Sequence, residues 1–309
     1  MLDAFLQTQP LATWTPNIRS FAFTCSFADA TGRAASGLPP KRQSNNANPN
    51  FTDEEVLTIY LFGIIKHRKT IHEIYDYARD HFAEWFPELG SYGGYNQRLN
   101  RLSAVFAPLV SEALSEIDRE NVVDTVRIAD SIPTRVAKQK RSSQATVASE
   151  FADKGYCSSK DTFFYGVKLH AVGRRKRGTM PVLECAGLTP GSENNLDALR
   201  RVLPTLGGGE LYGDRAYSDA SMQERLAKEQ DLNVLTPVKK KKGQEHLSAA
   251  DKLFSKAVSK VRQPIESPFS WIDEKTGIQC ASKVRSYQGL LVYVFGRLAA
   301  AMLLLAFNS

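Results

Sequence analysis

The amino-acid sequence predicts an α/β fold with a mixed sheet, preceded by a small all-helical domain. From residue 120 onward, short apolar runs that suit strands alternate with runs that suit helices, an order typical of an α/β domain. Residues 51–119 carry only helical patterns. We therefore expect a helical domain at 51–119 and the α/β domain at 120–309. Residues 1–50 end in GLPPKRQSNNANPN, which indicates a poorly ordered segment and a linker.

Two N-cap patterns begin the helical domain. Thr52 and Glu55 form a capping box ahead of an apolar run, and Thr70 and Glu73 repeat the pattern ahead of a second helix. Pro87 is expected to end that second helix, because proline cannot continue the hydrogen-bonding pattern. Each of the two helices is therefore expected to start directly after a threonine.

A third helix is expected over 95–117, after the turn GSYGG. Arg98 and Arg101 lie near its start. Three short helices with a basic third one are compatible with a helix-turn-helix motif that binds DNA. They are equally compatible with a bundle whose helices only pack together. Both interpretations of residues 51–119 stay open at this stage.

The α/β domain is expected to start with a buried strand and a hairpin, followed by alternating helices and strands. The basic turn RRKRG joins the two hairpin strands, and Asn194 or Asn195 suits the N-cap of the next helix. The expected strands are 122–130, 162–173, 180–191, 209–214 and 233–238, and the expected helices are 194–206, 218–230, one around Glu266, and 288–307.

The last apolar run, 288–307, is long enough in principle to span a bilayer. Arg297 lies in its middle, where a charge in lipid is costly. We therefore expect a buried helix that closes a protein core, with Arg297 paired with a carboxylate or reaching the surface. A membrane role is disfavoured.

Composition and charge narrow the function classes. Hydrophobic residues make up 42% and charged residues 24%, which excludes wholesale disorder, a fibre and a multi-span membrane protein. Lys and Arg number 40 against 33 Asp and Glu, and this net charge of +7 favours a polyanionic partner. The four cysteines show no C-x-x-C spacing, which argues against a zinc site or a disulfide framework and fits a reducing cytoplasm.

Two aspartates stand at similar places in the predicted sheet. Asp130 ends the run RIAD and Asp214 ends LYGD, and turn residues follow each of them. Carboxylates at the carboxyl ends of neighbouring strands converge where α/β sheets bind ligands. They repel one another unless a cation compensates, and Mg²⁺ or Mn²⁺ suits such oxygen ligands. The alternative is that each aspartate only caps the turn after it.

Glu266 is the third candidate carboxylate. It is expected near the start of a helix whose first turn holds Pro264, with Arg262 four residues earlier on the same face. At that place Glu266 would complete a two-metal site with the two aspartates. The alternative is a surface glutamate paired with Arg262, and Asp273 or Glu274 could substitute for it.

The order of these motifs resembles that of the DDE transposases of bacterial insertion sequences. The chain carries ADSIP around Asp130, then KLH, then YGDRAY around Asp214, and then R-x-x-x-E-x-x-F around Glu266. These three carboxylates match the family's catalytic triad one by one. The resemblance extends over roughly residues 51–307, with its most specific motifs around the two aspartates.

This resemblance implies a ribonuclease H-like catalytic domain in which the three carboxylates hold two Mg²⁺ or Mn²⁺ ions. It implies cleavage of DNA at the ends of an insertion sequence and transfer of the cut strand to a new site. The partners would be the terminal inverted repeats, target DNA and further copies of the chain assembled on DNA. The place of action would be the bacterial cytoplasm, at the nucleoid.

The glutamate motif departs from the pattern of related insertion-sequence enzymes, Y-x-x-R-x-x-x-E-x-x-x-x-x-x-K. Ser259 stands at the tyrosine position and Asp273 at the lysine position. The contacts that this lysine makes to terminal phosphates would then fall to Lys275 or Lys283, or be absent from this branch of the family.

Basic side chains gather in two blocks that flank the carboxylates in sequence. Segment 134–177 holds eleven Lys or Arg against three Asp or Glu, and a run of four lysines occupies 239–242. Such blocks neutralise phosphates, although a solvated loop is the alternative for the lysine run. The candidates for DNA contact in the first block and beside the carboxylates are Arg135, Lys138, Lys140, Arg141, Lys168, His170, Arg215 and Arg262.

His170 and Lys168 are expected on a strand next to that of Asp130. His170 could contact the scissile phosphate or a metal ligand, or could be a core histidine whose hydrogen bonds are satisfied. Lys168 lies two residues away on the same face and shares both interpretations. Arg215 follows Asp214 directly and could orient it or contact DNA.

The leading hypothesis is therefore a transposase with a metal-dependent DDE core. A catalytically decayed DNA-binding protein is the alternative from another class, but such a protein has no need of three carboxylates in an electropositive site. A metal-dependent nuclease that cuts and does not join strands is the third possibility.

Overall fold

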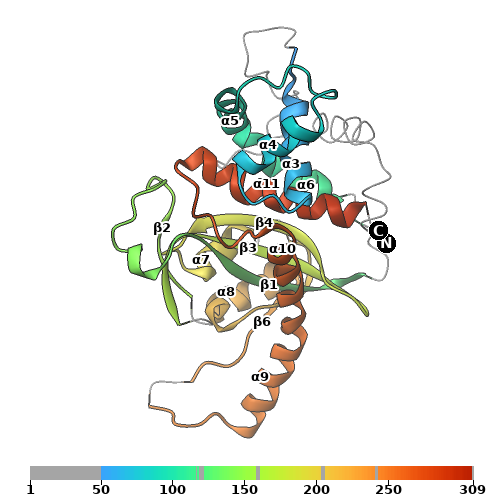
Figure 1. Ribbon diagram of the computed structural model, residues 1–309. Helices are drawn as coiled ribbons and strands as arrows, with labels where there is room; N and C mark the ends of the chain where they lie inside the picture. Colours follow the sequence, from blue (N-terminus) through green and yellow to red (C-terminus); the bar gives the residue numbers. More distant parts are fainter. Residues whose placement is uncertain are drawn as a thin grey trace. The chain divides into compact units, whose positions relative to one another are not determined.

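The computed structural model describes residues 50–307 apart from 116, 118–121, 158–160, 203–205 and 241–242 (Figure 1). The expected poorly ordered segment therefore lies outside the described residues, apart from residue 50. The chain divides into two compact units. Unit 1 comprises Met1–Ile117, Glu274–Ile278 and Lys283–Ser309, and unit 2 comprises Asp118–Asp273 and Gln279–Ser282.

Unit 1 is helical, and the C-terminal helix joins the N-terminal helices in it. Its helices are α3 (Asp53–Ile65), α4 (Ile71–His81), α5 (Tyr92–Arg101), α6 (Phe106–Ser115) and α11 (Tyr287–Ala306). The predicted capping box of α3 is confirmed, because the Thr52 hydroxyl accepts from the Glu55 N–H and the Glu55 carboxylate accepts from the Thr52 N–H. Thr70 likewise caps α4 by accepting from the Glu73 N–H.

Two predicted helix boundaries in unit 1 are wrong. Helix α4 ends at His81, well before Pro87, and the next residue, Phe82, packs its ring edge-on against Phe62 and Tyr77. The expected third helix is two helices, α5 and α6, separated by a 3-10 turn at Leu102–Val105. Pro108 explains the break, because it lacks an N–H and its ring excludes a regular helix over the preceding turn.

Helix α11 is buried, as expected for residues 288–307, but it belongs to the helical unit 1 and not to the α/β unit. It has the length and composition of a membrane span, but 67% of its apolar window is buried in the protein. Gly296 lets α3 approach closely, since a Cβ there would lie 2.5 Å from the Tyr60 ring. The expected environment of Arg297 is wrong. Arg297 is buried and donates to the carbonyl oxygens of Thr276 and Lys69 rather than to a carboxylate.

Unit 2 is built on a six-stranded mixed sheet. Its strands are β1 (Val122–Ala137), β2 (Asp153–Cys157), β3 (Thr162–Lys176), β4 (Val182–Pro190), β5 (Gly209–Tyr212) and β6 (Leu232–Leu235), in the order β2-β3-β1-β5-β6, with β4 paired to β3. The β1–β5 and β5–β6 pairs are parallel, and β3 runs antiparallel to β1, β2 and β4. The predicted β3–β4 hairpin is confirmed. Strand β2 is not predicted by the sequence, because DKGYC lacks an apolar alternation.

Helices cover both faces of this sheet. Helices α7 (Asn195–Val202) and α8 (Ala220–Gln230) contribute Leu199, Met222 and Leu226 to a core that includes Ala129 of β1. On the other face, helix α9 (Ala249–Arg262) leads through Gln263–Ile265 into α10 (Glu266–Thr276). There a Cβ added to Gly173 of β3 would lie 3.2 Å from the Ile265 side chain. The predicted α/β fold with a mixed sheet and a preceding helical region is confirmed, and it is consistent with a ribonuclease H-like transposase fold.

Candidate active site

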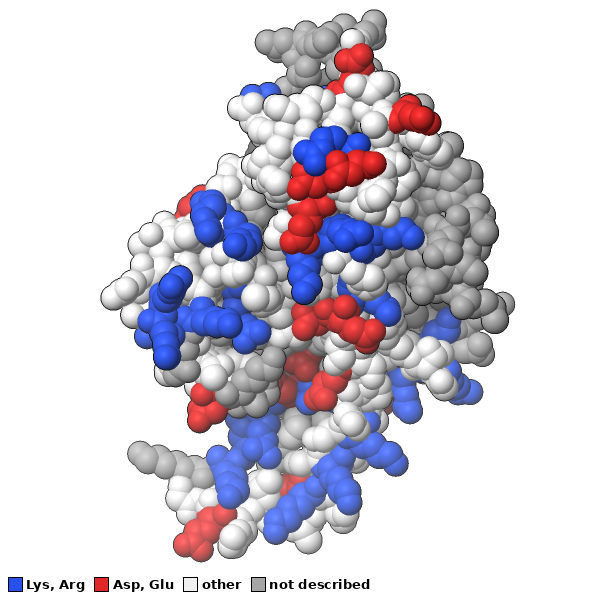
Figure 2. All heavy atoms as spheres, viewed as in Figure 1, with Lys and Arg blue, Asp and Glu red and all other residues white. Residues whose placement is uncertain are grey.

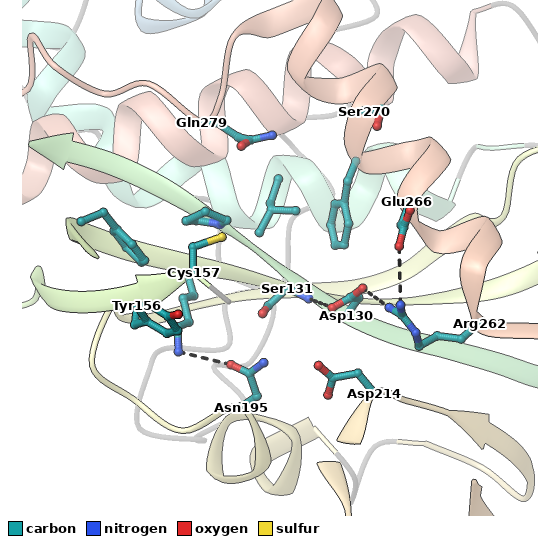
Figure 3. A pocket seen from close by; sticks show the side chains of 15 residues that line it. Asp130, Ser131, Tyr156, Cys157, Asn195, Asp214, Arg262, Glu266, Ser270 and Gln279 are labelled. Atoms are coloured by element: carbon teal, nitrogen blue, oxygen red, sulfur yellow. Dashed lines mark hydrogen bonds and ion pairs between the residues drawn. The ribbon is translucent and has the colours of Figure 1, made fainter. Parts of the chain in front are cut away.

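The register between β1 and β5 brings two carboxylates together. Ile128 pairs with Tyr212 in parallel, and Asp130 and Asp214 each follow two residues later. Side chains two residues apart on a strand point to the same face of the sheet. The two carboxylates are therefore expected to lie side by side on one face, next to the Ile128–Tyr212 pair. They line the same cavity, which has a volume of about 580 Å³. Figure 3 shows them next to one another.

The expected end of the first strand at Asp130 is wrong. Strand β1 continues to Ala137, because β3 pairs with it without a break from Arg127 to Arg135. Asp130 is therefore a mid-strand residue, whereas Asp214 follows the end of β5. The cavity opens at the place where β5 stops and β1 continues.

Asp214 caps the turn that follows β5. Its Oδ1 accepts a hydrogen bond from the Ala216 N–H at 2.8 Å, so the capping role and the place in the cavity belong to the same side chain. The preceding glycine is required by packing, since a Cβ on Gly213 would lie 2.8 Å from the Tyr217 ring. Burial strongly raises the pKa of Tyr217, so its hydroxyl stays neutral beside the carboxylates.

Asp130 is a largely buried carboxylate with a cationic partner. Its Oδ1 accepts from the Ser131 N–H at 2.8 Å, and its Oδ2 accepts from Nη1 of Arg262. Burial raises the pKa of Asp130, and the negative charge of Asp214 adds to this rise. Arg262 works in the opposite direction but does not cancel the rise. An ion that neutralises both aspartates would therefore relieve an existing electrostatic cost.

Glu266 begins α10 and lines the same cavity. Its Oε1 lies 3.5 Å from Nη2 of Arg262, so Arg262 is placed between Asp130 and Glu266 (Figure 3). The side chain of Glu266 is 62% exposed, compared with 17% for Asp130. Glu266 is thus both the partner of Arg262 and a wall of the cavity. Asp273 does not line the cavity; it accepts from the Gln279 N–H instead.

The donor set fits a hard divalent cation. Across the described residues, no three Asp, Glu, His or Cys side chains are grouped closely enough to hold a metal ion by themselves. Mg²⁺ does not require such a group, because it is usually held by one or two carboxylates together with water and substrate phosphate. Asp130 and Asp214 provide two carboxylates, and the Arg262 guanidinium supplies the positive charge that a cation would supply.

Lys168 and Asn195 form the opposite wall of the cavity. Lys168 Nζ donates to the Glu193 carbonyl oxygen at 2.8 Å and to Asn195 Oδ1 at 3.3 Å. Burial lowers the pKa of Lys168. The sequence does not single out Asn195 for this place. The N-cap of α7 is Asn194, whose Oδ1 accepts from the Leu196 N–H, and this leaves the next side chain to face the cavity.

His170 does not line the cavity that holds the three carboxylates. It pairs with Ser131 across the β1–β3 ladder and is buried, with Nε2 placed 2.8 Å from Thr189 Oγ1. Burial lowers its pKa to about 4, so the imidazole is neutral at physiological pH. Among the described residues, no group forms a hydrogen bond with its buried Nδ1 atom.

The remaining basic candidates lie away from the cavity. Arg135 lies opposite Cys280 in an isolated parallel bridge, in which its N–H donates to the Gln279 carbonyl oxygen and its own carbonyl oxygen accepts from the Ala281 N–H. Lys138, Lys140, Arg141 and Arg215 are exposed and do not line the cavity. Figure 2 shows basic side chains spread over the face of the protein that is visible in Figure 1, with acidic side chains between them. Of the eight basic candidates, only Lys168 and Arg262 meet the carboxylates in one cavity.

An exposed aromatic pair beside the cavity is absent from the sequence-based candidates. Tyr156 of β2 and Phe163 of β3 are 46% and 47% exposed, and their ring centroids lie 5.1 Å apart. Lys154 Nζ lies 5.0 Å from the Phe163 centroid. Tyr156 lines the cavity. The signal in the sequence is the aromatic run TFFY next to lysines, but only the pairing of β2 with β3 shows which rings face solvent.

A comparison with protein families gives a match over most of unit 2. A family described as the transposase DDE domain matches residues 120–278, which include Asp130, Asp214 and Glu266. A comparison with curated proteins gives no match. The family match spans more than half of the chain, confirms the resemblance to DDE transposases and implies DNA as the substrate. The chain belongs to the transposase DDE domain family.

Proposed function

We propose that this protein is a metal-dependent transposase of a bacterial insertion sequence. It cuts DNA strands at the ends of the element and joins the freed ends to a target, acting in the cytoplasm at the nucleoid as a homo-oligomer assembled on DNA. The observation that carries the proposal is the meeting of Asp130, Asp214, Glu266 and Arg262 on one cavity of about 580 Å³. Three acids placed around one arginine in a basic chain suit metal-dependent chemistry on a polyanionic substrate.

Asp130 and Asp214 would hold the divalent cations, with Glu266 as the third ligand. Bound Mg²⁺ or Mn²⁺ would lower the pKa of the attacking water or hydroxyl and stabilise the leaving 3′ oxygen. In cleavage, water adds to the phosphorus and the bond to the 3′ oxygen breaks, which leaves a 3′ hydroxyl. In strand transfer, that hydroxyl attacks a target phosphate and a target 3′ hydroxyl is released.

The chain's own residues position the strand. Arg262 neutralises Asp130 and Glu266 in the absence of metal, and once cations take over that role its guanidinium can bind a substrate phosphate. Lys168 and Asn195, on the opposite wall, suit the phosphate backbone on the other side of the scissile bond. Tyr156 and Phe163 provide ring faces on which an unpaired base can stack.

The test is strand cleavage and joining by the full chain on a labelled duplex that carries the element's own terminal repeat, with Mn²⁺. Asp214→Asn and Glu266→Gln should each reduce both products by about 100-fold or more, because the lost metal ligand removes several kcal/mol of transition-state stabilisation. Glu224→Gln is the matched control, since Glu224 lies on the exposed surface of α8 and pairs only with Lys228.

Each result separates the alternatives. If the parent chain joins DNA strands in a metal-dependent reaction and both variants lose this activity, the result supports the transposase proposal. Cleavage without joining would assign a nuclease instead. Salt-sensitive binding without cleavage in any of the proteins would assign a catalytically inactive DNA-binding protein.

A further inference from the structure

A second cavity lies wholly within unit 1, apart from the carboxylates. It has a volume of about 500 Å³ and is lined by residues of α3, α4, α5, α11 and the segment before α11. Four of its lining side chains are cationic, namely Lys69, Lys283, Arg285 and Arg297, and no Asp or Glu lines it. A concave surface whose charged side chains are all positive favours an anionic ligand.

Three helices present their first residues to this cavity. Thr70, Ile71 and His72 begin α4, Tyr92 begins α5, and Ser286 is the N-cap of α11. The first N–H groups of a helix lack intrahelical partners and carry a partial positive charge. Three such ends around one cavity add their dipoles to the charge of the four cationic side chains, so the whole lining favours an anion.

The environment of Arg297 is a second, independent observation that points to an anionic ligand. Its side chain lines the cavity, the residue is only 5% exposed, and it donates to two backbone carbonyls, those of Thr276 and Lys69. Its guanidinium lies 4.2 Å from the Tyr293 ring centroid. No carboxylate of the described residues pairs with it, and its Nε is buried there without a partner. A buried charge without a counter-ion is destabilising, and a bound anion would offset this cost.

The acids nearest to the cavity are already engaged. The Glu73 carboxylate accepts from the Lys69 N–H at 2.8 Å, and Asp76 pairs with His72 and Arg79. Neither acid lines the cavity. The exposed ammonium groups of Lys69 and Lys283 form no ion pair within the described part of the chain. These two lysines are therefore available to a ligand.

The rest of the lining suits a nucleotide rather than a bare ion. The Tyr92 and His72 rings lie 4.7 Å apart at the wall, and the amide side chains of Asn96 and Asn100 are close to them on α5. Aromatic faces stack on bases, and asparagine can bond base edges. The volume accommodates one nucleotide with its phosphate.

We propose that this cavity binds a phosphate, with its nucleotide, of the DNA strand that the transposase processes. The proposal rests on the DNA substrate of the proposed function and adds a second DNA contact, made by the helical unit. It differs from the helix-turn-helix interpretation, in which the basic residues of α5 would contact DNA. Arg98 is occupied there, because it binds the Asp53 carboxylate and the Phe51 carbonyl oxygen.

The test compares two double variants of the full chain. Lys69→Gln with Lys283→Gln removes two exposed charges from the cavity, and Lys66→Gln with Arg68→Gln removes two charges of unit 1 that lie outside it. Binding to a fluorescent oligonucleotide of the element's end is measured by anisotropy in EDTA, over a range of salt concentrations. The first variant should bind about 10-fold more weakly, with a salt slope less steep by about one. The control should stay within about twofold of the parent chain.

The remaining outcomes overturn the proposal. Equal loss in both double variants would show a general charge effect of unit 1. Unchanged DNA affinity in the first variant, with a melting temperature that inorganic phosphate raises only in the parent chain, would assign the cavity to free phosphate. Unchanged affinity without that phosphate effect would exclude an anion site. Because EDTA prevents cleavage, failure of the proposed catalysis leaves this measurement interpretable.

Discussion

Arg262 of α9 donates through Nη1 to Oδ2 of Asp130 in the middle of β1, although 132 residues separate them in sequence. The same guanidinium lies 3.5 Å from Glu266. In the absence of metal, the first and third members of the triad are therefore joined by a positive charge that belongs to the protein. In the proposed mechanism, a cation that binds these carboxylates would have to compete with Arg262, and metal binding would release the arginine.

Removal of Arg262 should raise the pKa of Asp130 further. Burial already raises this pKa above its ordinary value of 3.8, and Arg262 is the main group that opposes the rise. In the metal-free chain with Arg262→Gln, the carboxyl resonance of Asp130 should titrate at higher pH than in the parent chain, as followed by ¹³C NMR. Arg215→Gln is the control, since Arg215 is exposed and outside the cavity. An unchanged titration of Asp130 would contradict the ion pair.

The stability of the protein should fall between pH 6.5 and pH 4 because of His170. The folded-state pKa of His170 is lowered from 6.5 to about 4, so the unfolded chain binds more protons in this window and stability is lost as pH falls. The full effect is about 3 kcal/mol. Urea unfolding at pH 7 and pH 4.5 should show a smaller loss for His170→Gln than for the parent chain. His246→Gln is the control, because His246 is exposed. Equal losses in all three proteins would exclude a buried neutral His170.

Gly209 should tolerate no side chain at the start of β5. Its φ is +116°, and a Cβ there would lie 2.5 Å from the Thr125 carbonyl oxygen of β1. Gly209→Ala should therefore destabilise the fold by roughly 2–5 kcal/mol, through backbone strain and a clash between strands. Gly178→Ala in the β3–β4 turn is the matched control, because its φ of +73° is also positive but nothing lies within 4 Å. If chemical denaturation gave the same loss of unfolding free energy for both variants, the steric explanation would be wrong.

Tyr156 should contribute to DNA binding and not to folding. The side chain is 46% exposed at the edge of the cavity, and a stacked base is worth about 1–3 kcal/mol. Tyr156→Ala should weaken binding of a single-stranded oligonucleotide by about 10-fold and leave the melting temperature nearly unchanged. Phe254→Ala removes an aromatic ring of 45% exposure on α9, outside the cavity, and should change neither quantity. Similar affinity losses in both variants would argue against a defined stacking site.

The sequence by itself predicted most of the elements in their order, apart from β2 and the break between α5 and α6, and it singled out the three carboxylates of the candidate site. Thr52 and Thr70 mark helix starts because a capping hydroxyl acts within three residues along the chain. The strands of the hairpin follow from local apolar patterns, and Asp130, Asp214 and Glu266 stand out from the motifs around them. These signals are local, so they can be read without knowledge of the fold.

Only the tertiary structure decided where these residues meet. Strand β1 passes through Asp130 because β3 continues to pair with it, and the β1–β5 register then places Asp214 beside Asp130. The path of α9 on the sheet brings Arg262 between Asp130 and Glu266. Arg297 likewise finds backbone carbonyls and an acid-free cavity instead of a carboxylate. Strand register and helix packing are contacts between distant segments, and no local pattern encodes which segments pair.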